Sequence, residues 1–208
     1  MDLRERMRGV YGILDPEAKR DLDEVLAAYL MCGAKVIQLR MKHVPTRAIL
    51  EEAEKVRDRC RQAGVLFVVN DRADIAALLD ADGVHLGQSD IPVAAARALL
   101  PHGIVGKSTH NERQIHIAVA EGADYIGFGP VFRTSSKQNP APTTGTKGLQ
   151  EAVRTSSVPV VAIGGIALDN IKQVVATGIT GAATISCVAK AWQPTDAVRS
   201  LVRAFKIA

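Results

Sequence analysis

The sequence predicts an α/β protein whose single domain, residues 1–208, is a (β/α)8 barrel, also called a TIM barrel. Eight short runs rich in β-branched residues alternate with longer amphipathic runs, the order expected for a parallel sheet covered by helices. The strand-like runs are apolar along their length rather than alternating, as in strands buried on both faces. Aromatic residues make up only 4% of the chain, so the core must be aliphatic, which favours helices packed closely on a parallel sheet.

The predicted strands are spaced so that one helix fits after each of them. The strands cover residues 9–14, 35–40, 65–69, 83–86, 104–107, 125–128, 158–163 and 181–185. The helices cover residues 20–31, 46–63, 73–79, 91–100, 112–121, 149–155, 168–177 and 195–205. Eight strands that are each followed by a helix are the number that closes this kind of barrel.

Residues at the helix ends support these boundaries. Asn111 precedes the helix that starts at Glu112, where an N-cap side chain is expected. Four glycines fall just past a helical run, where a residue in left-handed conformation ends the helix: Gly33, Gly64, Gly122 and Gly178.

The main alternative is an open, doubly wound sheet. That fold would need a glycine-rich turn after the first strand, and the segment from Tyr11 to Pro16 supplies none. No domain boundary is visible along the chain. Residues 130–147 interrupt the alternation, since they are rich in Pro, Thr, Ser and Gly, and a loop of this length is expected to be a lid or binding loop.

Charge and composition narrow the kinds of partner. The net charge is +4, and the basic residues are spread out, so the sequence argues against nucleic-acid binding and agrees with a small anionic substrate. No apolar run is long enough to cross a membrane, and residues 1–6 do not resemble a signal peptide. We therefore expect a cytoplasmic protein with reduced thiols, and a homo-oligomer is compatible with the sequence. The thiols, which lack metal-ligand spacing, are Cys32, Cys60 and Cys187.

Polar side chains follow the second predicted strand. Gln38, Arg40 and Lys42 alternate, so in extended backbone they point to the same side. An amide, a guanidinium and an ammonium together suit an anion, since Arg grips phosphate through two hydrogen bonds and Lys acts as a point charge. The alternative is a solvated strand edge with local salt bridges.

Carboxylates follow the next two strands. Asn70 and Asp71 come directly after one strand, and Asp90 follows the other. Mg²⁺ is usually held by one or two carboxylates together with waters and substrate phosphates, so Asp71 and Asp90 are candidate magnesium ligands. The alternative for Asp90 is that it caps the helix that begins at Ile91 and Pro92.

The later strands end in hydroxyls and glycines. Ser108 follows the fifth strand, where it either donates a hydrogen bond to a ligand or satisfies a turn. A phosphate nest is expected where hydroxyls, backbone N–H groups and a lysine meet, at Thr134, Ser135, Ser136 and Lys137. Gly165, Ile185 and Ser186 follow the seventh and eighth strands, which is the usual phosphate site of these barrels. A lone histidine, such as His85 or His110, is more often structural than a base.

Two anion sites and one cation site on one rim indicate two phosphorylated substrates, one of them a diphosphate bound with a metal ion. No Walker A motif, no dinucleotide-binding glycine motif and no zinc spacing occurs in the sequence.

These residues resemble the thiamine phosphate synthase family over nearly the whole chain, from the first strand to the eighth. The resemblance is carried by Gln38-x-Arg40-x-Lys42, Asn70-Asp71-Arg72, Asp82-Gly83-Val84-His85-Leu86-Gly87-Gln88-x-Asp90, Gly106-x-Ser108-x-His110, Gly122-Ala123-Asp124-Tyr125-Ile126-Gly127, Gly129-Pro130-Val131-Phe132-x-Thr134, Ala162-Ile163-Gly164-Gly165-Ile166 and Ile185-Ser186.

The resemblance implies a reaction without a general base. A hydroxymethylpyrimidine diphosphate loses pyrophosphate with the help of Mg²⁺, and a thiazole phosphate, in plain or carboxylated form, captures the resulting pyrimidine cation. Asp71 and Asp90 would hold the Mg²⁺. The residues that would bind the pyrimidine diphosphate are Gln38, Arg40, Lys42, Asn70, Ser108 and Lys137, of which Arg40, Lys42, Ser108 and Lys137 would act in catalysis. The residues that would bind the thiazole phosphate are Thr134, Ser135, Ser136, Gly165, Ile185 and Ser186.

One segment departs from the family pattern. The lid of the family usually reads Thr-Pro-Thr-Lys, whereas this chain has Thr134-Ser135-Ser136-Lys137, which keeps the hydroxyls and the lysine but lacks the proline.

Two other functions are alternatives to synthesis. A related thiazole tautomerase would not use a complete diphosphate and Mg²⁺ set, and a non-catalytic sensor of a thiamine precursor should have lost metal ligands, whereas this chain keeps both sets.

Overall fold

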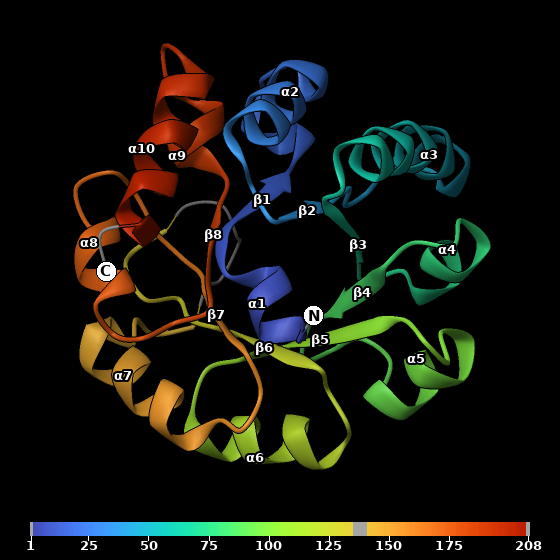
Figure 1. Ribbon diagram of the computed structural model, residues 1–208. Helices are drawn as coiled ribbons and strands as arrows, with labels where there is room; N and C mark the ends of the chain where they lie inside the picture. The colour runs from blue at the N-terminus through green and yellow to red at the C-terminus, as the bar shows by residue number, and fades with distance from the viewer. Residues whose placement is uncertain (1, 135–140, 207–208) are drawn as a thin grey trace.

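The computed structural model describes residues 2–134 and 141–206, and it contains a closed barrel of eight parallel strands (Figure 1). Each strand pairs with the next one along the chain, and β8 pairs with β1 to close the ring. The strands are β1 (Gly9–Leu14), β2 (Val36–Leu39), β3 (Leu66–Asn70), β4 (Gly83–Leu86), β5 (Ile104–Thr109), β6 (Tyr125–Phe128), β7 (Val160–Ala162) and β8 (Gly181–Thr184). The predicted (β/α)8 fold class is confirmed.

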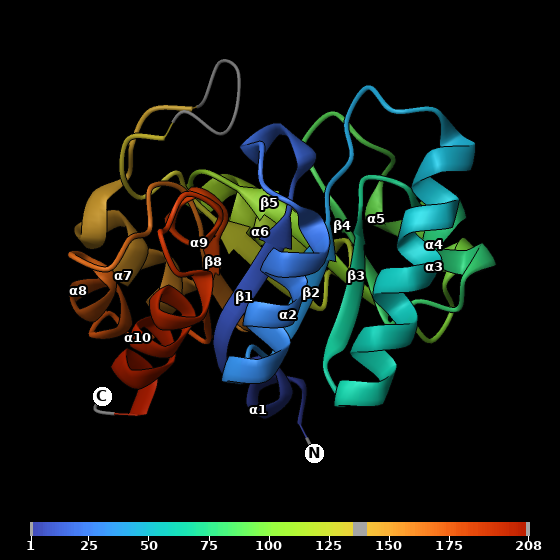
Figure 2. The ribbon, with the colours of Figure 1, turned by 90° about the horizontal axis from the view of Figure 1, so that it is seen from above.

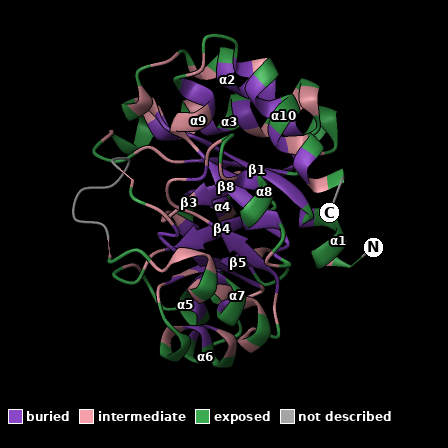
Figure 3. Cartoon of the chain, turned by 90° about the vertical axis from the view of Figure 1, so that its left-hand side faces the viewer, coloured by how far each residue is buried: buried purple, intermediate pink, exposed green. Residues whose placement is uncertain are grey.

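Helices follow the strands and surround the barrel. They are α2 (Leu22–Cys32), α3 (Thr46–Ala63), α4 (Ala73–Leu78), α5 (Val93–Leu99), α6 (Glu112–Ala120), α7 (Gly145–Thr155), α8 (Ile171–Val175), α9 (Ser186–Ala189) and α10 (Pro194–Lys206). Figure 3 shows that the strands at the centre are buried and that the helices expose their outer faces. In α3, for example, Ile49, Ala53, Val56 and Cys60 recur at helical spacing and are all buried against the sheet.

The strands carry two kinds of side chain, because neighbouring residues point to opposite faces of the sheet. Along β1, Val10 and Leu14 pack outward against the helices, whereas Tyr11 and Ile13 point into the barrel. The helix α1 (Leu3–Met7) lies across the amino-terminal end of the barrel in Figure 1, and the buried side chain of Met7 joins the interior cluster. One end of the barrel is therefore plugged, and the other is open to loops.

The sequence misses the shortest helices. The helices α1 and α9 and the 3-10 helix η1 (Pro16–Ala18) span three to five residues each, too few for a hydrophobic period to appear. The predicted helix of residues 168–177 is wrong at its start, because Asn170 instead holds a turn. Its side chain accepts a hydrogen bond from the backbone N–H of Ala167 and donates one to the carbonyl of Gly165. The predicted start of another helix is too late, because α7 begins at Gly145, four residues before the predicted start.

The loops that follow the strands all lie on one side of the molecule, and both chain termini lie toward the other side (Figure 2). This follows from the parallel order of the strands, which brings all their carboxyl ends to one rim. Among the described residues, no helix combines the length and the apolar character needed to cross a membrane.

Candidate active site

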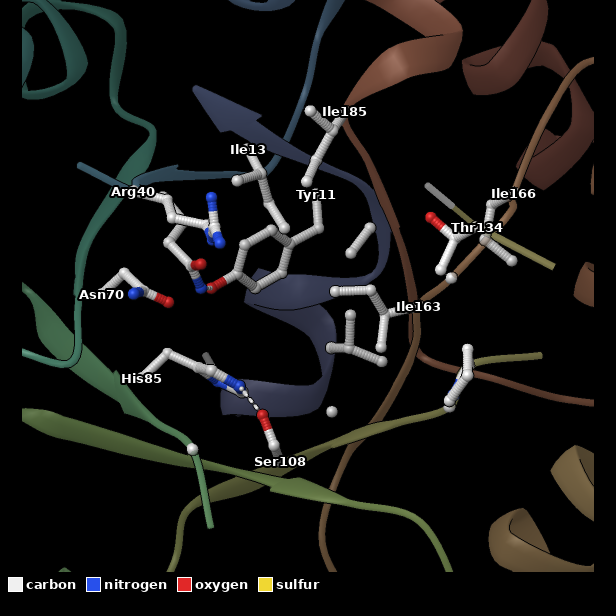
Figure 4. Close-up of a pocket in the computed structure, with 18 of the residues that line it drawn as sticks. Tyr11, Ile13, Arg40, Asn70, His85, Ser108, Thr134, Ile163, Ile166 and Ile185 are labelled. Carbon is white, nitrogen blue, oxygen red and sulfur yellow. Dashed lines mark hydrogen bonds between the residues drawn. The ribbon is translucent and has the colours of Figure 1, made fainter. Parts of the chain in front are cut away.

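The loops at the carboxyl ends of the strands surround a cavity of about 340 Å³ (Figure 4). Every predicted site residue that the structure describes lines this cavity: Gln38, Arg40, Lys42, Asn70, Asp71, Asp90, Ser108, Thr134, Gly165, Ile185 and Ser186. Ser135, Ser136 and Lys137 lie outside the described residues. The roles of all these residues in binding and catalysis stay predictions, but the fold brings the described ones to one place.

Arg40 is held by two carboxylates that were not among the predicted site residues. Its guanidinium forms an ion pair with the buried carboxylate of Asp15, and it lies 3.3 Å from the more exposed carboxylate of Glu17. Asp15 also accepts a hydrogen bond from the backbone N–H of Glu17, so it organises η1 as well as Arg40. The loop after β1 therefore fixes the position of a cation that directly follows the neighbouring strand, β2.

Three charged groups meet beside Arg40. The Lys42 Nζ lies 3.0 Å from Asp71 Oδ2, and the Asp71 carboxyl group neighbours that of Asp90. Burial and the neighbouring Asp71 carboxyl both raise the pKa of Asp90. Asp71 also has a left-handed backbone, with φ of 63°, a conformation that Asp tolerates better than most residues.

This acidic pair fits a magnesium ion that is shared with a substrate. Two neighbouring carboxylates repel each other, which a bound cation relieves, and hard carboxylate oxygens are the ligands that Mg²⁺ prefers. Among the described residues, no group of three or more His, Cys, Asp or Glu side chains is gathered in the way a closed metal site requires. Asp71 and Asp90 would therefore hold Mg²⁺ only together with waters and phosphate oxygens.

Asp90 is positioned by its own loop and does not cap a helix. Its Oδ2 accepts a hydrogen bond of 2.6 Å from the backbone N–H of Gly87, whereas α5 begins at Val93 without a side-chain cap. The capping alternative for Asp90 is therefore wrong. The buried Lys107 supports the same loop, since its Nζ donates to the Gly87 carbonyl at 2.8 Å.

The floor of the cavity is a chain of hydrogen bonds between side chains of five strands. Gln38 donates to the Tyr11 hydroxyl at 2.7 Å, and the hydroxyls of Tyr11 and Tyr125 are 2.9 Å apart. The Tyr125 hydroxyl is 2.9 Å from His85 Nδ1, and His85 Nε2 is 2.9 Å from Ser108 Oγ. Figure 4 shows Tyr11, His85 and Ser108 facing the cavity.

Burial keeps this floor uncharged. It lowers the pKa of His85 to about 4, with Asp90 acting in the opposite direction and Lys107 in the same one, so the imidazole is neutral at physiological pH. Burial likewise raises the pKa of Tyr11 and of Tyr125. The charged groups thus stand at the rim, and the deeper part of the cavity offers neutral hydrogen bonds and apolar surface.

The opposite side of the cavity is formed mainly by backbone and aliphatic side chains. The backbone N–H of Val131 donates to the Ile163 carbonyl at 2.9 Å, and that of Phe132 donates to the Gly164 carbonyl at 2.9 Å. A Cβ at Gly165 would lie 2.6 Å from the carbonyl oxygen of Arg133, and Gly165 has a φ of 66°. Only glycine allows this close approach of two loops.

The predicted site residues did not include Tyr11 and Tyr125, which line the cavity, or Asp15, which pairs with Arg40. A weak signal existed for Tyr125, because a Cβ at Gly106 on the paired strand would lie 2.2 Å from the Tyr125 ring. A glycine inside a strand often marks such a close approach, but the sequence does not say which residue approaches.

Comparisons with known proteins agree with the geometry. A family model described as thiamine monophosphate synthase matches residues 10–188. The chain is 46% identical to a thiamine-phosphate synthase of Myxococcus xanthus over 202 residues, which cover 96% of this chain and 93% of that one. It is also 46% identical to a thiamine-phosphate synthase of Chloroflexus aurantiacus over 177 residues, covering 85% and 82% of the two chains.

Solved structures point the same way. The thiamine phosphate pyrophosphorylase from Pyrococcus furiosus superposes with a TM-score of 0.91 at 37% identity, covering 99% of this chain and 98% of that one. A 3-hexulose-6-phosphate synthase matches with a TM-score of 0.65 at 20% identity, which shows the shared barrel fold alone.

Proposed function

The chain belongs to the thiamine monophosphate synthase family, and we propose that its cavity joins a hydroxymethylpyrimidine diphosphate to a thiazole phosphate with the help of Mg²⁺. The chain is an enzyme of the transferase class, and its activity is thiamine phosphate synthesis. The observation that carries the choice of substrates and metal is the cluster of Lys42, Asp71 and Asp90 above an uncharged floor. Such a site suits a ligand with an anionic group at the rim and a neutral ring below.

The diphosphate would bind at the charged rim. Arg40 and Lys42 present a guanidinium and an ammonium on the same side of the cavity, and their positions are held by Asp15 and Asp71. Bound by Asp71 and Asp90, Mg²⁺ would neutralise the charge that builds up on the departing pyrophosphate. Holding the diphosphate from several sides also orients the bond that must break.

The reaction would start with loss of pyrophosphate. The bond between the methylene carbon of the pyrimidine and the diphosphate oxygen breaks, and its electron pair leaves with pyrophosphate. Arg40 and Lys42 would stabilise the charge on the leaving group in the transition state, because ion pairs with Asp15 and Asp71 hold them at the rim beforehand. Lys137, which lies outside the described residues, is proposed to add a further positive charge.

The cation that remains needs protection from water. Ile13, Ile163 and Ile185 face the cavity in Figure 4, and the neutral hydroxyls of the floor lie beneath them. Apolar walls keep water from attacking the methylene carbon before the second substrate does. The hydrogen bonds of the floor join hydroxyl groups and a neutral imidazole.

The thiazole nitrogen would then form the new bond to the methylene carbon, giving thiamine phosphate. We propose that the thiazole phosphate lies on the opposite side of the cavity, next to Gly165, Ile185 and Ser186, with Thr134 near its phosphate. Backbone that approaches closely at Gly165 suits an anion without adding a fixed charge. Ser135 and Ser136 are assigned to the same phosphate from the sequence alone.

The proposal is tested by measuring pyrophosphate release with both substrates present, with Mg²⁺ and after its removal by a chelator. We expect rapid release only when Mg²⁺ and both substrates are present, together with formation of thiamine phosphate. The control reactions contain each substrate alone. Turnover that is unchanged without any divalent ion would contradict the magnesium assignment, and isomerisation of a thiazole without pyrophosphate release would contradict the reaction.

A further inference from the structure

We propose that Tyr125 is a positioning residue, which acts through His85 to point the hydroxyl hydrogen of Ser108 into the cavity. Each group in the chain of hydrogen bonds on the floor then donates to the next one toward Ser108. Gln38 and Tyr11, at the end away from Ser108, determine this donor-to-acceptor order. The inference rests on the proposed function only in its last step, where the pyrimidine diphosphate provides the acceptor that Ser108 meets.

The direction of the chain begins at Gln38. Its amide N–H donates to the Tyr11 oxygen at 2.7 Å, and Tyr11 is only 2% exposed. Among the described residues, Tyr125 is the only remaining hydrogen-bond partner of the Tyr11 hydroxyl. A buried O–H without an acceptor costs about 1–3 kcal/mol, so the hydrogen of Tyr11 points to the Tyr125 oxygen.

The same reasoning applies to the next hydrogen bond, between Tyr125 and His85. The Tyr125 oxygen accepts from Tyr11, so its own hydrogen must be donated elsewhere, and His85 Nδ1 is 2.9 Å away. Tyr125 is fully buried, which excludes water as the acceptor. His85 Nδ1 is therefore an acceptor and carries no hydrogen.

The tautomer of His85 determines whether Ser108 accepts or donates the hydrogen bond between them. A buried imidazole between two neutral hydroxyls is itself neutral and has one N–H group, which must then be at Nε2. Nε2 donates to Ser108 Oγ at 2.9 Å, so Ser108 accepts from below. Ser108 has no other side-chain hydrogen bond among the described residues, and it lines the cavity. Its hydroxyl hydrogen is free to be donated to an acceptor atom of the pyrimidine diphosphate.

The fold makes room for these two rings. A Cβ at Gly106 would lie 2.2 Å from the Tyr125 ring, and a Cβ at Gly127 would lie 3.0 Å from His85 Cε1. Gly106 and Tyr125 are direct partners in the register of β5 and β6. Glycines on β5 and β6 thus leave the space in which the rings of Tyr125 and His85 lie across the barrel in fixed orientations.

A second buried tyrosine, Tyr29, allows an experiment to distinguish this positioning role from a general effect on stability. Tyr29 on α2 is 0% exposed, and its hydroxyl donates to the Thr184 carbonyl at 2.9 Å, but it packs outside the barrel and takes no part in the chain. Tyr29→Phe removes the same atom from an equally buried ring. It is the matched control for Tyr125→Phe.

The first experiment reads the state of His85 in the protein without substrates. Nitrogen-15 NMR of protein labelled at its five histidines distinguishes hydrogen at Nδ1 from hydrogen at Nε2, and a His85→Asn variant assigns the signals. We expect hydrogen at Nε2 in the wild type and in Tyr29→Phe, and a mixture of both forms in Tyr125→Phe. Hydrogen at Nδ1 in the wild type would overturn the proposal. This result does not depend on which substrates the enzyme uses.

The second experiment measures turnover in a double-mutant cycle of Tyr125→Phe and Ser108→Ala. Tyr125→Phe alone should lower kcat/KM for the pyrimidine diphosphate by about tenfold, the worth of one hydrogen bond, with the KM for the thiazole phosphate unchanged. In the Ser108→Ala background the same change should have no further effect, because Ser108 is the group through which Tyr125 acts.

An equal loss in both backgrounds would show that Tyr125 acts only on stability, and so would the same kinetic loss in Tyr29→Phe. Thermal unfolding of each variant confirms that it is folded. If the proposed substrates were wrong, no variant and no wild type would turn them over, whereas the histidine signals would still report the direction of the chain.

Discussion

The two sides of the cavity are built by different means. On the side of β2 to β5, charged and polar side chains provide the chemistry, and each is held by a partner, as Arg40 is by Asp15 and Lys42 is by Asp71. On the side of β6 to β8, glycines and aliphatic residues line the wall, and backbone hydrogen bonds join the loops after β6 and β7. Figure 4 shows this contrast, with Arg40 and Asn70 facing Ile163, Ile166 and Ile185 across the cavity.

The difference indicates that the two sides of the cavity have different roles in the proposed reaction. In the proposed reaction, the leaving pyrophosphate builds up charge that cations and Mg²⁺ would stabilise, whereas the attacking thiazole needs a close fit and little fixed charge. Substitutions on the first side should therefore change the chemical step, and those on the second side should change substrate binding and loop geometry.

The largest expected effect is on the charged side. Asp71→Asn keeps a residue that tolerates the left-handed backbone but removes a carboxylate from the proposed Mg²⁺ site. We expect pyrophosphate release to fall on the order of a thousandfold, since a catalytic metal ion contributes several kcal/mol. The affinity for thiazole phosphate should stay close to that of the wild type.

Asp74→Asn is the matched control for that change, because Asp74 pairs with Arg72 at the surface, outside the cavity. Single-turnover kinetics over a range of Mg²⁺ concentrations make the measurement. Wild-type turnover of Asp71→Asn at limiting Mg²⁺ would remove Asp71 from the metal site.

The next effect is on the glycine side. Gly165→Ala should raise the KM for thiazole phosphate about tenfold or more, because the new Cβ would push against the backbone of Arg133. Gly122→Ala is its control, since Gly122 also has a positive φ but nothing lies within 4 Å of its Cβ position. Both variants should lose about 1–2 kcal/mol of stability from left-handed alanine. Equal kinetics in the two variants would mean that the close approach at Gly165 has no role in binding.

A smaller effect separates the two carboxylates that hold Arg40. Asp15→Asn should destabilise the protein by about 3 kcal/mol, because a largely buried arginine loses its partner. Glu17→Gln should lower stability by less than about 1 kcal/mol, since the Glu17 side chain is 54% exposed. Urea unfolding of both variants makes the comparison. Equal losses would show that Asp15 and Glu17 share the task.

The smallest expected effect is the pH dependence of Asp90. Its pKa is raised in the folded protein, so its contribution to stability is present at low pH and is lost as the pH rises through the raised value. Asp90→Asn should therefore slightly increase the thermal stability of the metal-free protein at neutral pH, by at most about 1 kcal/mol because the group is only half-buried.

The affinity for Mg²⁺ should change in the opposite sense. Mg²⁺ needs the ionised carboxylate, so its affinity should start to fall, on acidification, at a pH above the usual range of an aspartate. The Mg²⁺ concentration that gives half-maximal pyrophosphate release, measured at several pH values with both substrates present, tests this. An affinity that stays constant down to the ordinary aspartate range would contradict the raised pKa.

The sequence predicted the rim of this enzyme better than its interior. In parallel strands the carboxyl ends meet at one rim, so any residue just after a strand could be placed there once the strands were known, as with Asp71, Asp90 and Gly165. The predicted boundaries were good where apolar runs are long, as in α3, and poor where elements are short, as in α8.

Only the tertiary structure showed how the interior is connected. Tyr11, Tyr125 and His85 are distant along the chain, and their contacts depend on strand register and on which neighbour is a glycine. Residue type and spacing determine where a side chain can point, because alternation along a strand is local. The partner that it meets across the barrel depends on all eight strands closing together, and this is why the hydrogen-bond chain of the floor and the ion pair of Arg40 with Asp15 appear only in the folded protein.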